Sequence, residues 1–360
     1  MLSKLNYKLT ITLLTFTFGL NVYATVNAKD PSDQFDKIFL HIDTVDLPEL
    51  KHPFFKSEFH FVGDFFCIVD QPMQQIRCFN DKGEMIKEIG GPGSGPGEFG
   101  QLIMIDFDQD ENILAALDVN RRVTFFDGQG IKLRSLIIRG THHNFDIAFA
   151  GSEKQYIALG GLSFNSSNYG IEEDSGIIHI YDNYSGDYIR SFHPAVKLSN
   201  GMDLRERMSL YGVNLGVVVK TDFDGSILIM QPLEYSLTRY DVFGNELGKP
   251  ISNVPEHVEI VNEPIPVGAG SVVDEHSFWY EKSRHLVHNF FVSNHGYIFV
   301  VQTFQPLMYS ISIYDRGGNS IKTNIPTDKE LRAVKDSLYY FTSFNEEKNI
   351  YQLHIYKLNL

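Results

Sequence analysis

The sequence predicts an all-β protein, a six-bladed β-propeller closed by its own N-terminal strand. One observation behind this prediction is a marker that recurs along the chain, an aromatic residue followed by Asp or Asn and a glycine turn. The other is the alternation of side chains in the segments that precede the markers, which is typical of β-strands. Repetition of short strands at blade-sized intervals is the sequence pattern of a propeller.

The markers are spaced as the blades of a propeller would be. Successive copies lie about 42 to 74 residues apart, which accommodates one four-stranded blade each once loop insertions are allowed. The Asp or Asn and the glycine that follows it supply a tight turn into the next strand. The copies are Phe79-Asn80, Phe126-Asp127, Tyr181-Asp182, Tyr240-Asp241, Tyr314-Asp315 and a degenerate sixth at Ile355-Tyr356.

A second strand, introduced by its own turn, precedes most markers. Residues 222–225 lead into the apolar segment 227–230, and residues 294–296 lead into the segment 297–301. Turn, strand, loop, strand, turn and strand is the order expected within a propeller blade. Helix is scarce, since only residues 203–210 have a locally helical pattern.

The last blade lacks one strand. Residues 331–334, 338–344 and 351–358 provide three strands before the chain ends. The alternating segment 37–42, which stands ahead of the first blade, fits as the missing outer strand. Closure of this kind removes an open sheet edge that would otherwise favour aggregation. We therefore expect one propeller domain over residues 25–360.

The first 24 residues have the pattern of an export signal. Lys4 and Lys8 precede an apolar segment at residues 9–20, and residues 22–24 (Val-Tyr-Ala) provide a cleavage site. We expect cleavage after position 24, a periplasmic or extracellular location, and no membrane span in the mature protein. An uncleaved anchor is the alternative, although the apolar segment is shorter than the roughly 20 residues that a membrane span needs.

The composition restricts the partners of the chain. Its 31 basic and 45 acidic residues give a net charge of −14, and loss of the two signal lysines would make it more negative. Such a chain repels phosphate backbones, so nucleic acid is not an expected partner. With 43% hydrophobic and 13% aromatic residues, the chain can build a large core. We expect a monomer without a cofactor.

A glycine-rich segment carries a family resemblance. Residues 91–99 (GPGSGPGEF) lack the Lys-Ser/Thr of a P-loop. They resemble the inter-blade connection of NHL-repeat propellers, and residues 105–114 and 120–123 are similar to the two segments that follow it in that family. The whole mature chain resembles the TolB-like or NHL-repeat-like six-bladed propellers that Bacteroidetes export. The resemblance implies the fold but no single activity, since such propellers include lyases, lactonases and binding proteins.

The long insertions share one face of the predicted propeller. Residues 161–176, 194–212 and 250–284 belong to inter-blade connections or to loops between second and third strands, whereas the Asp-Gly turns on the other face stay short. Long loops on a rigid scaffold indicate a binding surface. We interpret the chain as a non-catalytic protein that binds a carbohydrate, peptide or protein through this loop-rich face. The alternative is a calcium- or zinc-dependent propeller hydrolase or lyase acting at the central mouth.

Several polar and aromatic residues are candidates for ligand binding on that face. Three Gln-Pro pairs recur before the markers and would either point amides into the central mouth or cap strand ends. Trp279 and Tyr280 would form an aromatic platform or pack the largest insertion against the rim. His142, His143 and Arg205 would contact ligand or lie on a solvated surface. The candidates are Gln71, Gln231, Gln305, His142, His143, Arg205, Trp279 and Tyr280.

No catalytic motif supports the enzymatic alternative. No Ser-His-Asp order, His-Glu-x-x-His motif or Gly-x-Ser-x-Gly motif stands out in the sequence. Four histidines lie between positions 276 and 295, but i and i+3 point to opposite faces of a strand, so no metal site is assigned. The histidine set of a lyase similar to the NHL-repeat enzymes would be His60, His179 and His354, which otherwise pack or face solvent.

Cys67 and Cys78 are the only cysteines, and both fall in one predicted hairpin. If Asp70 faces Gln75, antiparallel pairing places the two cysteines opposite each other, at a separation that a disulfide accepts. An exported chain allows this bond. The alternative is a pair of reduced thiols that act as small apolar side chains.

Overall fold

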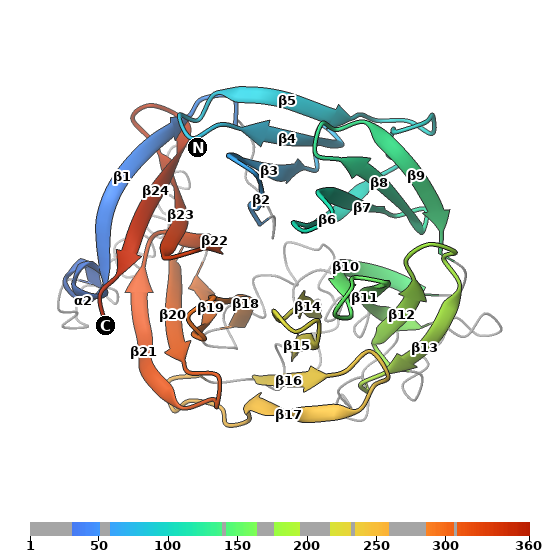
Figure 1. Ribbon diagram of the computed structural model, residues 1–360. Coiled ribbons are helices and arrows are strands. Elements are labelled where there is room, and N and C mark those ends of the chain that lie inside the picture. The colour runs from blue at the N-terminus through green and yellow to red at the C-terminus, as the bar shows by residue number, and fades with distance from the viewer. Residues whose placement is uncertain are drawn as a thin grey trace, which may run out of the picture.

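Six four-stranded antiparallel sheets surround a central axis in the computed structural model (Figure 1). The fold class is the one predicted. The structure describes residues 31–50, 58–138, 142–163, 176–194, 217–231, 235–258, 286–305 and 308–360. Within these residues no helix is long and apolar enough to cross a lipid bilayer.

In each blade the earliest strand of the sheet lies nearest the axis and the following strands lie successively farther out. The last blade departs from this order only in its outermost strand, which comes from the N-terminal region. In blade order the strands are β2 (His60–Val62), β3 (Phe65–Asp70), β4 (Gln75–Phe79) and β5 (Met85–Gly90); β6 (Leu102–Asp108), β7 (Ile113–Asp118), β8 (Arg122–Asp127) and β9 (Lys132–Ile137); β10 (His142–Ala150), β11 (Tyr156–Ser163), β12 (Ile178–Asp182) and β13 (Tyr188–Phe192); β14 (Val218–Thr221), β15 (Ile227–Gln231), β16 (Ser236–Tyr240) and β17 (Glu246–Ile251); β18 (Leu286–Val292), β19 (Ile298–Gln305), β20 (Met308–Tyr314) and β21 (Ser320–Thr327); and β22 (Glu330–Lys335), β23 (Leu338–Asn345) and β24 (Ile350–Leu358) with β1 (Phe39–Leu47).

The first five predicted markers end the third strands of their blades, and their Asp or Asn side chains stabilise the turns that follow, whereas the sixth lies inside β24. Asp241 Oδ1 accepts the backbone N–H of Phe243 at 2.8 Å and that of Asn245 at 2.9 Å, while Gly244 N–H bonds to Asp241 O at 3.1 Å. Gly244 has φ of 77°, a left-handed conformation that glycine adopts without a Cβ clash. The marker sequence is therefore the local chemistry of a tight turn.

The aromatic residue of each marker packs the core. The side chains of Phe79, Phe126, Tyr181, Tyr240 and Tyr314 are all buried. Buried apolar residues form clusters that each combine two neighbouring blades, because side chains of a blade alternate between the blades on its two sides. The core of the propeller therefore lies between blades, and the axis is left to the inner strands.

The N-terminal strand closes the ring as predicted, with shifted bounds. β1 pairs antiparallel with β24, from Phe39 opposite Leu358 to Leu47 opposite Tyr351. The predicted strand covered residues 37–42, but the observed strand runs farther toward the C-terminus and the first two of those residues are helical.

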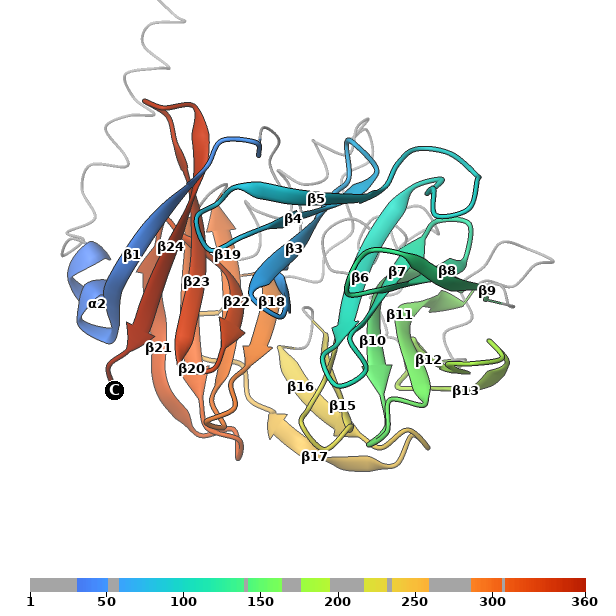
Figure 2. The same ribbon diagram turned by 45° about the horizontal axis from the view of Figure 1, so that its top comes forward.

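A short helix that the sequence pattern did not indicate precedes the closing strand. Helix α2 (Pro31–Ile38) lies against β21 and β1 (Figure 2). Its Phe35 stacks on Phe39 with ring centroids 4.8 Å apart and meets Phe341 edge to face at 5.2 Å. Two buried apolar side chains in one eight-residue helix give too short a pattern for a periodicity argument. The helix predicted at residues 203–210 lies outside the described residues.

Cys67 and Cys78 lie directly opposite each other on β3 and β4, in the register expected from Asp70 facing Gln75. Their Cα atoms are 4.0 Å apart, and the structure contains the disulfide between them. Both residues are buried among apolar neighbours of the first and second blades. The bond therefore links adjacent strands inside one blade.

Register shifts recur in the inner strands. They occur between Leu102 and Met104 in β6, between Asn144 and Asp146 in β10, between Val287 and Asn289 in β18, and between Leu331 and Ala333 in β22. One residue at each shift has no directly opposed partner, and such bulges redirect side chains. In β18 and β22 these residues are His288 and Arg332, which both enter a buried polar cluster described below.

Candidate functional site

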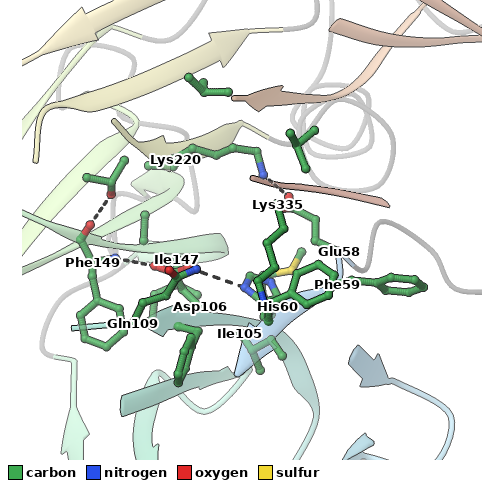
Figure 3. A pocket seen from close by; sticks show the side chains of 18 of the residues that line it. Glu58, Phe59, His60, Ile105, Asp106, Gln109, Ile147, Phe149, Lys220 and Lys335 are labelled. Atoms are coloured by element: carbon green, nitrogen blue, oxygen red, sulfur yellow. Dashed lines mark hydrogen bonds and ion pairs between the residues drawn. The ribbon is translucent and has the colours of Figure 1, made fainter. Parts of the chain in front are cut away.

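A cavity of about 320 Å³ lies on the axis of the propeller (Figure 3). The inner strands of all six blades contribute to its wall, mostly through their C-terminal parts and the turns that follow. The cavity therefore reaches the face where first strands turn into second strands, opposite the face of the inter-blade connections. The turn residues that line it are Gln109, Lys154, Phe223, Asn294 and Asp336.

An ion pair crosses the axis at this cavity. Glu58 precedes β2 of the first blade and Lys220 lies on β14 of the fourth blade, which stands on the opposite side of the ring (Figures 1 and 3). Asn289 of the fifth blade donates its amide N–H to Glu58 Oε1 at 3.0 Å. Burial alone would raise the pKa of Glu58, but Lys220 and His60 hold it below its usual value. Glu58 is therefore a carboxylate that is already neutralised by contacts across the ring.

His60 and Asp106 face each other from neighbouring inner strands. His60 Nδ1 lies 3.7 Å from Asp106 Oδ1, and Asp106 Oδ2 accepts the backbone N–H of Phe149 at 2.7 Å (Figure 3). Burial lowers the pKa of His60, and this effect exceeds the opposing influence of Glu58 and Asp106. The ring is neutral near pH 7, and its hydrogen belongs on Nδ1, beside the carboxylate. His60 Nε2 is buried and has no hydrogen-bond partner in the described part of the chain.

Asp146 is the most deeply buried carboxyl group of the cavity wall. Its Oδ1 accepts the N–H of Ile147 at 2.9 Å and its Oδ2 accepts the N–H of Val219 on the next blade at 2.8 Å. Burial, together with the negative charge of Glu58, raises the pKa of Asp146 to about 7. This group therefore changes protonation state near neutral pH.

Free edges of the inner strands explain why carboxylates occur here. The innermost strand of each sheet has one unpaired edge, whose backbone groups need partners. Asp106 accepts from the edge of β10, Asp146 accepts from the edge of β14, and Thr221 donates its hydroxyl to Phe149 O. These side chains join the second, third and fourth blades around the axis. Part of the polar wall is therefore structural, and only the remaining polar atoms are available to a ligand.

A second polar cluster lies between the fifth and sixth blades. Glu330 Oε1 accepts from His288 Nε2 at 2.7 Å, and Glu330 Oε2 accepts from Tyr309 hydroxyl at 2.8 Å and lies 2.7 Å from an Arg332 guanidinium nitrogen. Arg332 Nε also donates to Thr342 Oγ1 at 3.1 Å. Burial alone would raise the pKa of Glu330, but Arg332 and His288 hold it below its usual value. We call these residues the Glu330 cluster.

Of the predicted ligand-binding residues, Gln71 is the one whose side chain belongs to the described part of the structure, and it does not line the cavity. Gln71 donates to Ile103 O of the next blade at 3.2 Å, which agrees with the strand-capping alternative. Gln231 and Gln305 end β15 and β19. His142 and His143 begin β10, Arg205, Trp279 and Tyr280 lie outside the described residues, and the ligand-binding role of all eight remains a prediction.

The structure separates the three histidines that a lyase-like site would need. His60 lines the cavity, whereas His179 is buried within the third blade with its Nδ1 2.6 Å from Ser191 Oγ. His354 lies in the closing sheet, where its Nδ1 is 3.1 Å from Thr44 Oγ1. Within the described residues no group of three His, Cys, Asp or Glu is arranged to hold a metal ion.

Sequence reasoning named His60 only as a member of a lyase-like histidine set and did not select the other ionisable residues of the cavity. Glu58 and Lys220 stand 162 positions apart, so only ring closure brings them together. Asp106 and Asp146 each occur singly in strand segments, where no local spacing distinguishes them from ordinary strand residues. The available signal was one ionisable residue on each of several inner strands. The residues concerned are Glu58, His60, Asp106, Asp146 and Lys220.

Comparison with known proteins gives the same fold. A Bacteroides fragilis protein that is inferred to be exported has a crystal structure similar to this chain, with a TM-score of 0.62 and 13% sequence identity, covering 93% of this chain and 98% of that chain. A member of the DUF4221 family from Bacteroides vulgatus is similar at a TM-score of 0.61 and 11% identity, covering 89% of this chain and 98% of that chain. No curated protein matches the sequence. Residues 20–262, about two thirds of the sequence, match the DUF5128 family of six-bladed β-propellers, and the chain belongs to this family.

Proposed function

We propose that this propeller is an exported, non-catalytic protein that binds a small polar ligand in its central cavity. The observation that carries the proposal is a concave site on the axis with ionisable side chains from five of the six blades in its wall. Its volume of about 320 Å³ is at the lower end of pockets that hold small molecules. Inner strands joined by hydrogen bonds between blades give this wall the rigidity that selective binding requires.

Three observations support export. The first 24 residues have the charged, apolar and small-residue order of a signal peptide. A Bacteroides fragilis propeller with a similar fold is inferred to be exported. A structural disulfide agrees with an oxidising compartment outside the cytoplasm.

The contacts of the carboxylates favour binding over metal-dependent hydrolysis. Glu58 is paired with Lys220, and both oxygens of Asp146 already accept backbone N–H groups. A calcium ion takes six to eight oxygen ligands, so it would have to displace these contacts and would meet the ammonium group of Lys220. Asp106, with one oxygen bonded to the backbone and its side chain 25% exposed, is better suited to a hydrogen bond with a ligand.

Blocking the cavity mouth tests the proposal. Asn294 lines the cavity and His295, its neighbour in the same exposed turn, does not. We would screen metabolite-sized polar compounds by saturation-transfer NMR against the native protein, Asn294→Trp and His295→Trp. The expected result is a set of compounds that the native protein and His295→Trp bind and that Asn294→Trp does not. Absence of any bound compound, or equal binding by both variants, would contradict the proposal.

A further inference from the structure

We infer that the ligand of the central cavity is a neutral polyhydroxylated molecule of mono- or disaccharide size rather than an organic cation or anion. The inference rests on the proposed function and names the chemical class that the cavity wall would accept. Its basis is the balance of charges around the cavity and the identity of the polar atoms that remain available.

Charges of both signs line the cavity. The wall contains the carboxyl groups of Glu58, Asp106, Asp146 and Asp336, and it contains the ammonium groups of Lys154, Lys220 and Lys335. A ligand that carries one net charge would approach groups of its own sign as well as groups of the opposite sign. A neutral ligand avoids burying an uncompensated charge.

The pKa values of two buried groups, His60 and Asp146, are influenced by charges of both signs. Burial is the largest influence on the pKa of both His60 and Asp146. Beyond burial, Glu58 raises both pKa values and Lys220 lowers both. Each position therefore feels carboxylate and ammonium groups together, with the carboxylates the stronger influence at both positions.

Several of the charged groups are already bonded within the protein. Lys220 is bonded to Glu58, Lys335 Nζ donates to Gly63 O at 2.9 Å, and Asp146 accepts two backbone N–H groups. These groups have hydrogen-bonding capacity left, because an ammonium has three donors and a carboxylate oxygen has two lone pairs. A hydroxyl can add to such a group as donor or acceptor without breaking its ion pair.

Asp106 is the strongest remaining acceptor of the wall. Its Oδ2 is held by Phe149 N–H, while among the described residues its Oδ1 has only the distant contact with His60 at 3.7 Å. A hydroxyl donor bonded to a carboxylate forms a charge-assisted hydrogen bond, about twice as strong as a neutral one. The side-chain amides of Gln109 and Asn294, which also line the cavity, can both donate and accept.

Aromatic side chains supply the apolar part of the wall. Phe59, Phe61, Phe107, Phe149 and Phe223 line the cavity beside the polar groups. Apolar ring faces next to carboxylates and amides match a molecule whose C–H groups and hydroxyls alternate over its surface. A small apolar ligand would leave the polar wall groups without partners, which is costly in a confined site.

A matched set of probes separates the three classes of ligand. Glucose, glucosamine and glucuronate share one ring and differ in carrying no charge, a positive charge or a negative charge, and the same series can be made for galactose and mannose. Binding would be measured by saturation-transfer NMR and calorimetry with the full mature chain. We expect at least one neutral sugar to bind about tenfold more tightly than its charged counterparts. We also expect Asp106→Asn to weaken that binding about tenfold, while Asp110→Asn, an exposed residue of the next turn, leaves it unchanged.

The other outcomes overturn the inference in distinguishable ways. Tighter binding of the amino sugar or of the uronate would assign the cavity to a cation or an anion instead. Failure of every sugar, with another compound bound in a manner that Asn294→Trp abolishes, would reject this ligand class and leave the proposed function standing. Failure of every compound in the NMR screen would reject both. Equal effects of Asp106→Asn and Asp110→Asn would remove Asp106 from the site.

Discussion

The inner strands of the propeller carry two polar clusters, the cavity wall and the Glu330 cluster, whose residues are similar but whose contacts differ. In the Glu330 cluster, His288, Tyr309 and Arg332 contact both oxygens of one carboxylate, and Glu330 and Arg332 are 7% and 6% exposed at their side chains. In the cavity, Asp106 keeps one oxygen without a close donor from any residue that the structure describes, and its side chain is 25% exposed. A carboxylate with all its contacts made stabilises the fold, whereas one with an open oxygen can bind a ligand.

The difference follows from where the bulges lie. His288 and Arg332 are the residues without an opposed partner in β18 and β22, and both turn toward Glu330. In β6 and β10 the equivalent residues are Ile103 and Phe145, which bring no charge. The acidic groups of these two strands therefore meet backbone N–H groups of the next blade and the open cavity.

Breaking the Glu330 cluster should give the largest effect. Arg332→Met removes the guanidinium and leaves Glu330 buried without its cationic partner, so we expect the free energy of unfolding to fall by about 3–5 kcal/mol. Urea denaturation followed by circular dichroism would measure the change. Replacing both members, in Glu330→Leu/Arg332→Met, should recover part of the loss, because no unpaired charge remains. A loss below 1 kcal/mol for Arg332→Met would show that this cluster contributes little to stability.

A structural feature could be predicted from the sequence where the residues that form it are adjacent in the chain. The marker turns were predictable because an Asp, its turn and a glycine are adjacent in sequence, as the contacts of Asp241 with Phe243 and Asn245 show. Strand closure was predictable from a missing strand and a spare alternating segment. The bounds of that strand were not, because packing of Phe35 against Phe341 holds the start of the segment in a helix.

The site was less predictable because it is assembled from single residues of distant strands. Alternation places Asp106 and Asp146 on inner strands but does not say which oxygen a neighbouring backbone will use. The sequence argument followed loop length to the loop-rich face, whereas the cavity reaches the face of the short turns. The finer resemblance to TolB-like and NHL-repeat propellers remains a prediction, and family membership fixes the fold alone.

The two clusters should contribute to stability with opposite dependence on pH. Burial and Glu58 raise the folded-state pKa of Asp146 to about 7, against an unfolded value near 3.9, so its stabilising contribution is complete below about pH 4 and is lost as the pH rises through 7. The difference in unfolding free energy between native protein and Asp146→Asn should therefore decrease by up to about 4 kcal/mol between pH 4 and pH 8.

The stabilising contribution of Glu330 should change with pH in the opposite direction, because its pKa is lowered in the folded state. Its contribution is present above its unfolded pKa and is lost as the pH falls through its folded pKa, so the difference between native protein and Glu330→Gln should shrink only in acid. Each variant must be compared with the native protein at the same pH, because two histidines also change the stability of both proteins in acid. Burial lowers the pKa of His193 and His354 to about 4, so these groups destabilise the native fold below about pH 6.5. A difference for Asp146→Asn that does not vary with pH would contradict the assignment.

The smallest effect on stability is expected at Asp106, where the comparison between the clusters is sharpest. Asp106→Asn keeps an oxygen that can accept the N–H of Phe149, and a neutral His60 can move its hydrogen from Nδ1 to Nε2 so that Nδ1 accepts from the new amide. We therefore expect the free energy of unfolding to change by about 1 kcal/mol or less, measured by urea denaturation beside Asp110→Asn. The same variant should lose most of its sugar binding, because an amide is a weaker acceptor than a carboxylate. A loss of stability close to that of Arg332→Met would instead mean that Asp106 is a structural group, as Glu330 is.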